Sequence, residues 1–393
     1  MSENFIYDTA ISVAPEYKND ILRHSKTWAE IDLCALKGNY RKITEHLKKN
    51  APECDSVCIL KADAYGHGAN MCAKALASEG ARIFGVSCIA EAIQLRSALR
   101  DFDGCEILIL GYTLPEDYDL LIKYDITQTV FSAEYANALS GVASSRKSDK
   151  KLKVHIKLNT GMNRLGFANT DSDIENIKKI CRNECFSVEG IFTHFACADE
   201  PSCTMTKKQY DVYRDVVKKV GYDFKYRHVC NSPACVFDVD MHENLVRFGM
   251  LLYGCLSPDM PLDTKPVMKF CTTVSHIFTL KKGDTVSYGA TYKAEEDRTV
   301  ATLPIGYADG FIRAFEKSRV KIGGRSCPVI GHICMDQCMV DITGFEDDIK
   351  IGDTVTIFGD EPEQIEALAK CAGTIPYEVL CLVGKRVSRA YRE

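Results

Sequence analysis

Residues 58–68 read CILKADAYGHG, an apolar run that meets a loop of small residues and glycines at Lys61. The run Ser56–Lys61 has the length of a β-strand, and the glycines that follow it are strong turn formers. Lys61 is therefore predicted at the carboxyl end of a strand. A lone lysine there usually extends into water, but a desolvated lysine has a lowered pKa and can act as a nucleophilic amine.

The pattern around this strand repeats along the first two thirds of the chain. Short apolar runs alternate with amphipathic stretches such as Glu91–Leu99 and Lys207–Val220, and connections of that length are typical of parallel strands. We predict a (β/α)8 TIM-like barrel, although a doubly wound sheet would give a similar pattern. The predicted strands are Ser56–Lys61, Arg82–Cys88, Glu106–Gly111, Thr127–Phe131, Lys153–Asn159, Val188–His194, Arg227–Asn231 and Val246–Tyr253.

Strand-like runs dominate after Pro266, which predicts a second, mostly β domain with a helix near Glu363–Cys371. We divide the chain into an N-terminal extension (1–27), a barrel domain (28–265) and a C-terminal β domain (266–393). The extension could be disordered or could add a strand to the β domain. The runs of the β domain are Val267–Leu280, Thr285–Tyr288, Thr299–Pro304, Val320–Ile322, Pro328–Ile342 and Thr354–Phe358.

The composition is that of a globular protein, with 393 residues, 46% hydrophobic residues and a formal net charge of −5. This charge gives no reason to expect nucleic acid or an anionic membrane as a partner. No apolar run approaches the roughly 20 residues that span a bilayer, and the polar N-terminus leads us to expect a cytoplasmic protein. The 19 cysteines form no C-x-x-C pair, so we expect reduced thiols that pack as small hydrophobes, and no metal site.

Further polar motifs follow other predicted strands. Lys157 and Arg164 belong to the segment KLNTGMNRLG, and His194 follows an apolar run. Asn231-Ser232-Pro233 begins at the last residue of the seventh predicted strand. The segment RFGM at residues 247–250 lies within the eighth. Barrels commonly bind phosphate after these two strands, through hydroxyl and backbone N–H groups. Each motif alone is weak, because Asn-Ser-Pro is also an ordinary turn.

Three segments of the predicted β domain also carry polar or reactive groups. Tyr288 precedes Gly289, which indicates an irregular, exposed segment rather than a packed strand. Residues 331–337 read GHICMDQ, and Tyr377 lies in the segment IPYE near the C-terminus.

Taken together, these motifs resemble those of the alanine racemases in their order from Trp28 to about Arg389. That family consists of pyridoxal 5′-phosphate enzymes built from a barrel and a β domain. The resemblance implies an amino-acid racemase that interconverts L-alanine and D-alanine with two bases and supplies D-alanine for peptidoglycan. It also implies a homodimer with shared active sites and a small-molecule substrate.

The resemblance assigns the reaction to two bases. Lys61 carries the cofactor and serves one face of the substrate, and Tyr288 reaches in from the partner subunit to serve the other. The backbone N–H of Met335 binds the substrate carboxylate across the dimer interface, and Asp336 supports the site. Tyr307 and Arg313 resemble residues that line the substrate channel.

The resemblance also assigns the cofactor contacts. Arg247 faces the pyridine nitrogen, and His194 orients Arg247. Arg164 contacts the phenolic oxygen and the substrate carboxylate, and Lys157, whose counterpart is often carbamylated, orients Arg164. The groups implied to bind the phosphate belong to Tyr65, Ser232, Gly249, Met250 and Tyr377. The chain departs from the family at Asn159, where aspartate is usual, and at His332, where arginine is common.

Three alternatives stay open at this point. A serine or broad-specificity racemase would use the same machinery, although serine-preferring relatives tend to have asparagine where Tyr377 stands. A non-catalytic barrel protein that binds pyridoxal phosphate would lack the β domain. A decarboxylase of basic amino acids would combine a similar barrel and β domain, but its cysteine-acid motif is not found.

Overall fold

The strand that precedes Lys61 is one of eight parallel strands that form a barrel. The computed structural model describes residues 5–8, 25–146, 150–200, 202–255 and 262–393. Within it, β3 to β9 follow each other in order and β10 pairs with β3. The N–H of Arg247 in β10 donates to Cys230 O, just after β9, at 3.1 Å. The barrel prediction is confirmed and the doubly wound alternative is wrong.

The barrel strands agree with the predicted runs to within a few residues. The structure has β3 (Asp55–Ile59), β4 (Ile83–Val86), β5 (Glu106–Ile109), β6 (Ile126–Val130), β7 (Leu152–Lys157), β8 (Phe186–Phe192), β9 (Tyr226–His228) and β10 (Leu245–Phe248). The run Val246–Tyr253 is an exception, because its strand ends at Phe248. Gly249 leaves the extended conformation (φ −107°, ψ −108°), and α11 (Met250–Tyr253) follows it.

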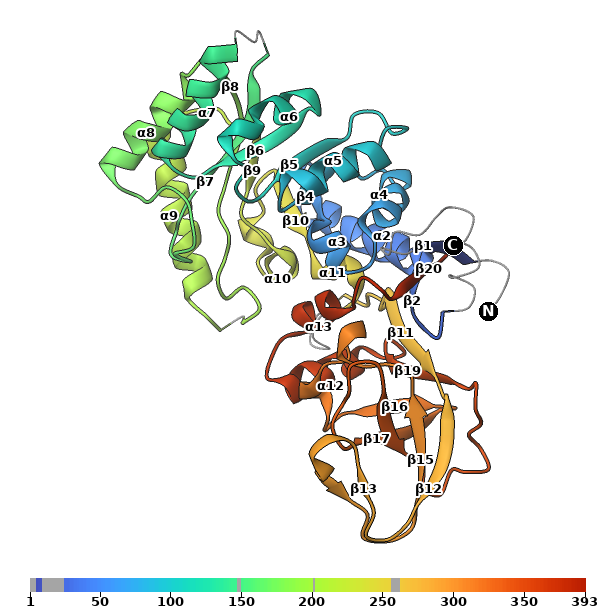
Figure 1. Cartoon of the computed structure of the whole chain (residues 1–393). Coiled ribbons are helices and arrows are strands. Elements are labelled where there is room, and N and C mark those ends of the chain that lie inside the picture. The colour runs from blue at the N-terminus through green and yellow to red at the C-terminus, as the bar shows by residue number, and fades with distance from the viewer. Residues whose placement is uncertain (1–4, 9–24, 147–149, 201, 256–261) are drawn as a thin grey trace.

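Helices cover the outside of the barrel, as Figure 1 shows. Helix α9 (Met205–Val220) buries Tyr213, Val216 and Val220, which share one face because they are spaced by three or four residues. No helix among the described residues has both the length and the apolar character needed to cross a bilayer. The other helices of the barrel domain are α2 (Leu33–Asn50), α3 (Lys61–Tyr65), α4 (Ala69–Ser78), α5 (Ile89–Ala98), α6 (Tyr118–Lys123), α7 (Ala133–Arg146), α8 (Asp171–Cys181) and α10 (Ser232–Phe237).

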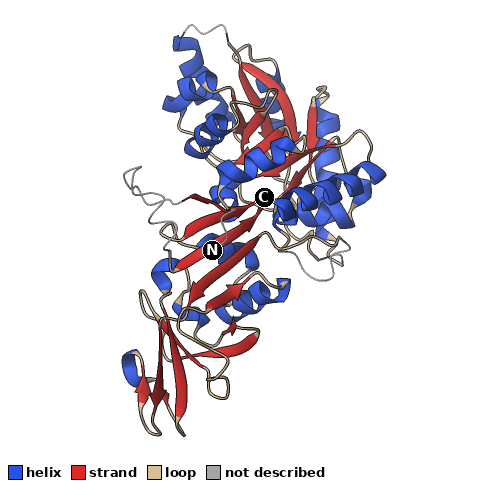
Figure 2. Cartoon of the chain, turned by 90° about the vertical axis from the view of Figure 1, so that its right-hand side faces the viewer, coloured by secondary structure: helices blue, strands red, loops and turns tan. Residues whose placement is uncertain are grey.

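Among the described residues, ten strands form a second sheet, which builds the β domain in the order β1-β20-β2-β11-β19-β16-β17-β18-β15-β12 (red arrows in the middle and lower parts of Figure 2). Strands β13 (Thr285–Val286) and β14 (Tyr292–Lys293) form a separate two-stranded sheet. Two helices, α12 (Pro362–Ala372) and α13 (Pro376–Leu382), complete the domain. The strands are β1 (Phe5–Asp8), β2 (Thr27–Asp32), β11 (Met268–Thr273), β12 (His276–Leu280), β15 (Arg298–Leu303), β16 (Arg319–Ile322), β17 (Arg325–Ile330), β18 (Cys338–Asp341), β19 (Thr354–Phe358) and β20 (Ser388–Arg392).

The sheet of the β domain takes strands from both ends of the chain. Strand β1 pairs with β20, so the N-terminal extension adds a strand, while residues 1–4 and 9–24 lie outside the described part. Strand β2, which the sequence analysis placed in the barrel domain, pairs with β20 and β11. It leads directly into α2, whose N-terminus is capped by Asp32 Oδ1 accepting from Ala35 N at 2.8 Å.

Two predicted strands of the β domain are interrupted where predicted site residues lie. The run Pro328–Ile342 is a strand only to Ile330, and a loop crosses residues 331–337 before β18 begins. The run Thr285–Tyr288 ends at Val286, and Tyr288 starts a 3-10 turn. Ser287 and Gly331 both have positive φ angles, which end the extended conformation at these points.

A buried arginine of β20 ties the β domain to the loop after Lys61. Arg389 donates from Nε to Gly66 O at 3.1 Å, and its other nitrogens donate to Gly384 O, Val387 O and Val383 O. The loop that carries Lys61 is therefore held by both domains.

Candidate functional site

A cavity of about 310 Å³ opens at the carboxyl ends of the barrel strands. Its lining brings together side chains from seven barrel strands or their following loops and from α13 of the β domain. Every residue that the sequence assigned to the cofactor lines it, together with Lys157. These residues are Lys61, Tyr65, Lys157, Arg164, His194, Ser232, Arg247, Gly249, Met250 and Tyr377.

The segment after β3 holds Lys61 in a strained turn. Ala62, Asp63, Ala64 and Tyr65 all have left-handed φ angles between 52° and 55°, a conformation that costs roughly 1–2 kcal/mol for each residue with a Cβ. Glu91 supports this turn, since its Oε1 accepts from Ala62 N at 2.8 Å. Burial and the neighbouring Arg164 lower the pKa of Lys61, which favours a neutral, nucleophilic amine.

A small cradle of hydroxyl groups lies at the far side of this turn. Ser232 Oγ accepts from Gly249 N at 2.9 Å, so two groups predicted to bind phosphate contact each other. A Cβ on Gly249 would lie 3.3 Å from Ser232 Oγ and 3.4 Å from Tyr65 Oη. The rings of Tyr65 and Tyr377 pack edge to face at 6.1 Å between centroids. Because Gly249 has no side chain, the hydroxyl and N–H groups around it are accessible, and such groups suit a phosphate.

Arg247 is a buried cation whose hydrogen bonds go to carbonyls and histidines. Its Nη2 donates to Thr193 O at 2.9 Å and to Val229 O at 2.8 Å, and lies 3.1 Å from His194 Nδ1. Its Nη1 lies 2.9 Å from His228 Nδ1. Burial lowers the pKa of Arg247 to about 10, so the guanidinium stays protonated at neutral pH.

The histidines around Arg247 are neutral. Burial first, and then the charge of Arg247, lower the pKa of His194 and of His228 well below the usual value. His228 Nε2 lies 3.0 Å from His155 Nδ1, and burial lowers the pKa of His155 to about 3. Sequence reasoning found His194 but missed His155 and His228. The signal that could have found His155 is its position two residues before Lys157, which puts both on one face of β7.

Lys157 lies beside Arg247 at the end of β7. Burial is the largest cause that lowers its pKa, to about 7, and the charges of Arg247 and Arg164 add to it. Its Nζ donates to Leu158 O at 2.5 Å. A neutral amine is the form that reacts with carbon dioxide, so the chemistry of this lysine suits the carbamate expected from the sequence.

Asn159 shapes the loop that carries Arg164. Its Oδ1 accepts from Gly161 N at 3.2 Å and from Asn163 N at 3.0 Å. An aspartate would accept the same two bonds, so the departure from the family at this position keeps the turn. Arg164 is exposed and extends toward the cavity from this turn.

Apart from Tyr377, the β-domain residues predicted for the site lie outside this cavity. Tyr288 is 72% exposed and Met335 is 53% exposed, and neither lines the cavity of its own chain. Figure 1 shows β13, which precedes Tyr288, at the end of the β domain remote from α3. Tyr307 is also exposed, Arg313 Nε lies 3.4 Å from Glu316 Oε1, and Asp336 pairs with Arg386. One chain therefore holds two separate groups of predicted site residues.

Comparisons with known proteins assign both parts of the chain to one family. The profile described as "Alanine racemase, N-terminal domain" matches residues 31–257, and "Alanine racemase, C-terminal domain" matches residues 267–391. The alanine racemase of Methanococcus maripaludis is 38% identical over 93% of this chain and 98% of its own length. That of Clostridium novyi is 39% identical over 93% of this chain and 95% of its own.

Solved structures give the same result. The alanine racemase of Clostridium difficile 630 is 40% identical, with a TM-score of 0.88 over 94% of this chain and 96% of that chain. The alanine racemase of E. faecalis is 32% identical, with a TM-score of 0.86 over 94% of this chain and 99% of that chain.

The lowered pKa of Lys157 predicts a pH-dependent reaction with carbon dioxide. Protonation blocks the amine below its pKa, so the carbamate should form above about pH 7 and disappear below it. With ¹³C-labelled bicarbonate, the wild-type protein should show a carbamate ¹³C NMR signal that grows as the pH rises from about 6 to about 8.

The control is Lys153→Gln, which removes a half-buried lysine of the same strand that pairs with Asp125. This variant should keep the signal, and Lys157→Gln should lose it. A signal that survives in Lys157→Gln would contradict the assignment.

Proposed function

The chain belongs to the alanine racemase family, and on that premise we propose that it interconverts L-alanine and D-alanine with pyridoxal 5′-phosphate in the barrel cavity. The observation that carries the proposal is the convergence of Lys61, Arg247 and the Tyr65–Ser232 cradle in one cavity of about 310 Å³. The product D-alanine would serve peptidoglycan synthesis.

The residues of the cavity fit the cofactor from end to end. The hydroxyls of Tyr65, Ser232 and Tyr377 would hold its phosphate, Arg247 would face its pyridine nitrogen, and Lys61 would carry it covalently. When bound, the cofactor withdraws electrons from the substrate Cα and makes the Cα proton acidic.

Arg247 would keep the proton chemistry at Cα. Its guanidinium remains a cation at neutral pH, so it would donate a hydrogen bond to the pyridine nitrogen and leave that nitrogen unprotonated, whereas an aspartate partner would favour its protonation. An unprotonated ring would withdraw electrons from Cα less strongly, so Arg247 would favour return of the proton to Cα, and thus racemisation over transamination.

Two bases are needed because a proton leaves one face of Cα and returns to the other. Lys61 Nζ, with its lowered pKa, would serve the face of the D-alanine proton. Tyr288 Oη of a second copy would serve the opposite face. Arg164 and the Met335 N–H of the second copy would bind the substrate carboxylate, and Tyr307 and Arg313 would line the approach. We therefore propose a homodimer in which each site uses both chains.

The alternatives receive less support. The match to the C-terminal family profile disfavours a non-catalytic single-barrel protein. The decarboxylase reading has no motif to support it. Tyr377 lines the cavity where serine-preferring relatives tend to have asparagine, which supports alanine over serine.

Lys61→Ala should abolish both racemisation and covalent attachment of the cofactor, because no other amine in the cavity has the same position. After borohydride treatment of the wild-type protein, peptide mass spectrometry should find the reduced cofactor on residue 61. Lys74→Ala, which changes an exposed lysine of α4, is the control and should behave as wild type. Label on another lysine in Lys61→Ala would show that the cofactor lysine is wrongly assigned.

Tyr288→Phe should slow racemisation in both directions by about 10²- to 10⁴-fold, the usual contribution of one acid–base group. Cofactor loading should survive, because Tyr288 lies outside the cavity of its own chain. Exchange of the Cα proton with deuterated solvent separates the two bases. The variant should still exchange the D-alanine proton through Lys61 and should nearly lose exchange from L-alanine.

The matched control is Tyr222→Phe, which changes a partly exposed tyrosine of the barrel. Equal exchange from both enantiomers in Tyr288→Phe would point to a single mobile base or to water.

The shared site predicts complementation between two inactive variants. A hybrid of one Lys61→Ala and one Tyr288→Phe subunit keeps one site with both bases, so mixing the variants should restore part of the activity. Subunit exchange is verified by native mass spectrometry. Hybrids that form and stay inactive would show that each chain builds its site alone.

A further inference from the structure

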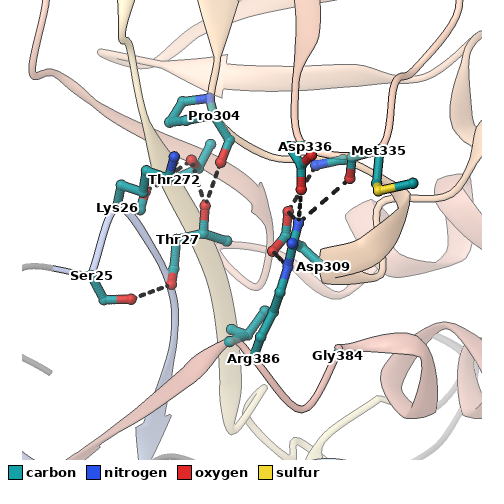
Figure 3. A network of polar contacts seen from close by, with 12 residues as sticks. Ser25, Lys26, Thr27, Thr272, Pro304, Asp309, Met335, Asp336, Gly384 and Arg386 are labelled. Atoms are coloured by element: carbon teal, nitrogen blue, oxygen red, sulfur yellow. Dashed lines mark hydrogen bonds and ion pairs between the residues drawn. The ribbon is translucent and has the colours of Figure 1, made fainter. Parts of the chain in front are cut away.

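A cluster of ionic contacts lies directly behind the turn that carries Met335 (Figure 3). Arg386 donates from Nε to Asp309 Oδ1 at 2.6 Å and from Nη2 to Asp309 Oδ2 at 3.0 Å. The same Nη2 lies 2.7 Å from Asp336 Oδ1 and 3.5 Å from Met335 O. One planar guanidinium thus joins the segment 306–310, the turn 334–337 and the segment before β20. We call these contacts the Arg386 clamp.

Hydrogen bonds from the segment 306–310 fix the orientation of the peptide groups in the turn 334–337. Tyr307 N donates to Cys334 O at 3.0 Å, and Ala308 N donates to Met335 O at 3.1 Å. A peptide unit is planar and trans, so its carbonyl oxygen and its N–H point in opposite directions. Because Cys334 O points to Tyr307, the N–H of Met335 points away from that segment. Among the hydrogen bonds of the described residues, none uses this N–H.

Close packing fixes the distance between the segment 306–310 and the turn 334–337. A Cβ on Gly306 would lie 2.2 Å from Cys334 O and 2.4 Å from Met335 O, so only glycine permits this approach. Asp309 also accepts from Gly306 N at 2.9 Å through Oδ2, and its backbone oxygen accepts from Gly384 N at 2.8 Å. The Asp309 carboxylate is only 8% exposed, and loss of Arg386 would leave its charge buried and uncompensated.

We propose that Arg386 is a positioning residue for substrate binding, which aims the Met335 N–H at the substrate carboxylate by clamping Asp309 and Asp336 behind the turn. This inference rests on the proposed function, in which that N–H reaches the site of the second copy. Arg386 touches neither substrate nor cofactor, and it acts through the turn. A lysine could not replace it fully, because an ammonium group lacks the planar fork that binds Asp309 with two nitrogens.

The clamp is tested with Arg386→Ala and Arg386→Lys in the full-length, cofactor-loaded dimer. Without the clamp, the hydrogen bond from the Met335 N–H to the substrate carboxylate would be lost or poorly aligned. KM for alanine should therefore rise roughly ten- to a hundredfold. The change in kcat should be much smaller, because both bases are untouched. The inhibition constant of propionate, a carboxylate without an amine, should rise by the same factor as KM. Arg386→Lys should lie between wild type and Arg386→Ala, and added guanidinium should partly restore Arg386→Ala.

The matched control is Arg325→Ala, which breaks an exposed pair with Asp348 (3.0 Å) elsewhere in the β domain. It should leave KM and propionate inhibition unchanged. A loss of kcat with unchanged KM in Arg386→Ala, or a loss of propionate inhibition without a change in KM, would overturn the proposal. If Arg386→Ala does not fold, Asp336→Asn removes the exposed arm of the clamp alone and should still raise KM, by a smaller factor.

A readout without activity separates this inference from the proposed function. Hydrogen–deuterium exchange of residues 334–337 in the loaded dimer should be faster in Arg386→Ala than in wild type and unchanged in Arg325→Ala. If the wild-type protein does not racemise alanine, the proposed function is wrong, while faster exchange would still show that Arg386 orders the turn. Unchanged exchange in Arg386→Ala would refute the clamp whatever the activity.

Discussion

The buried guanidinium of Arg247 determines the electrostatics of the barrel mouth. No carboxylate contacts it among the described residues, and carbonyls and neutral histidines take its hydrogen bonds. Burial, and next the nearby charge of Arg247, lower the pKa of Lys157 to about 7 and keep His194 neutral. The cavity keeps a surplus of positive charge that an anionic phosphate and a carboxylate would neutralise. The buried charge of Arg247 thus contributes both to a cavity that suits anions and to the neutral form of the amine and imidazole groups beside it.

A second constraint concerns the strained turn that begins at Lys61. Four consecutive residues with left-handed φ angles would be unstable in isolation. The barrel supports the turn through Glu91, and Asp63 Oδ1 accepts from Ala69 N at 2.7 Å at the start of α4. The β domain supports it through Arg389 and Gly66 O. Because both domains hold this turn, the position of the Lys61 amine depends on how the two domains pack against each other.

The sequence predicted the elements whose cause is local and missed those whose cause is distant. Strand-length apolar runs between amphipathic helices are local, so the barrel could be predicted, and β19 agrees residue for residue with Thr354–Phe358. The end of β10 at Phe248 and the loop 331–337 depend on backbone approaches that periodicity does not record, such as Gly306 against Cys334 O. His155 and His228 could not be assigned, because a lone histidine does not reveal which cation it will face. The roles of the site residues came from the family resemblance, and the structure brings the barrel group of them into one cavity.

The separation of the two groups of residues within one chain links assembly to chemistry. Tyr288 and Met335 are 72% and 53% exposed in the single chain, so both remain available to a second copy. A base on the same chain as Lys61 would have to reach around the substrate to its opposite face. A base on the second copy in the proposed dimer would approach that opposite face from outside the barrel. In the proposed dimer, covering Tyr288 and Met335 and completing the two-base site are therefore the same event, and a subunit that dissociates loses both.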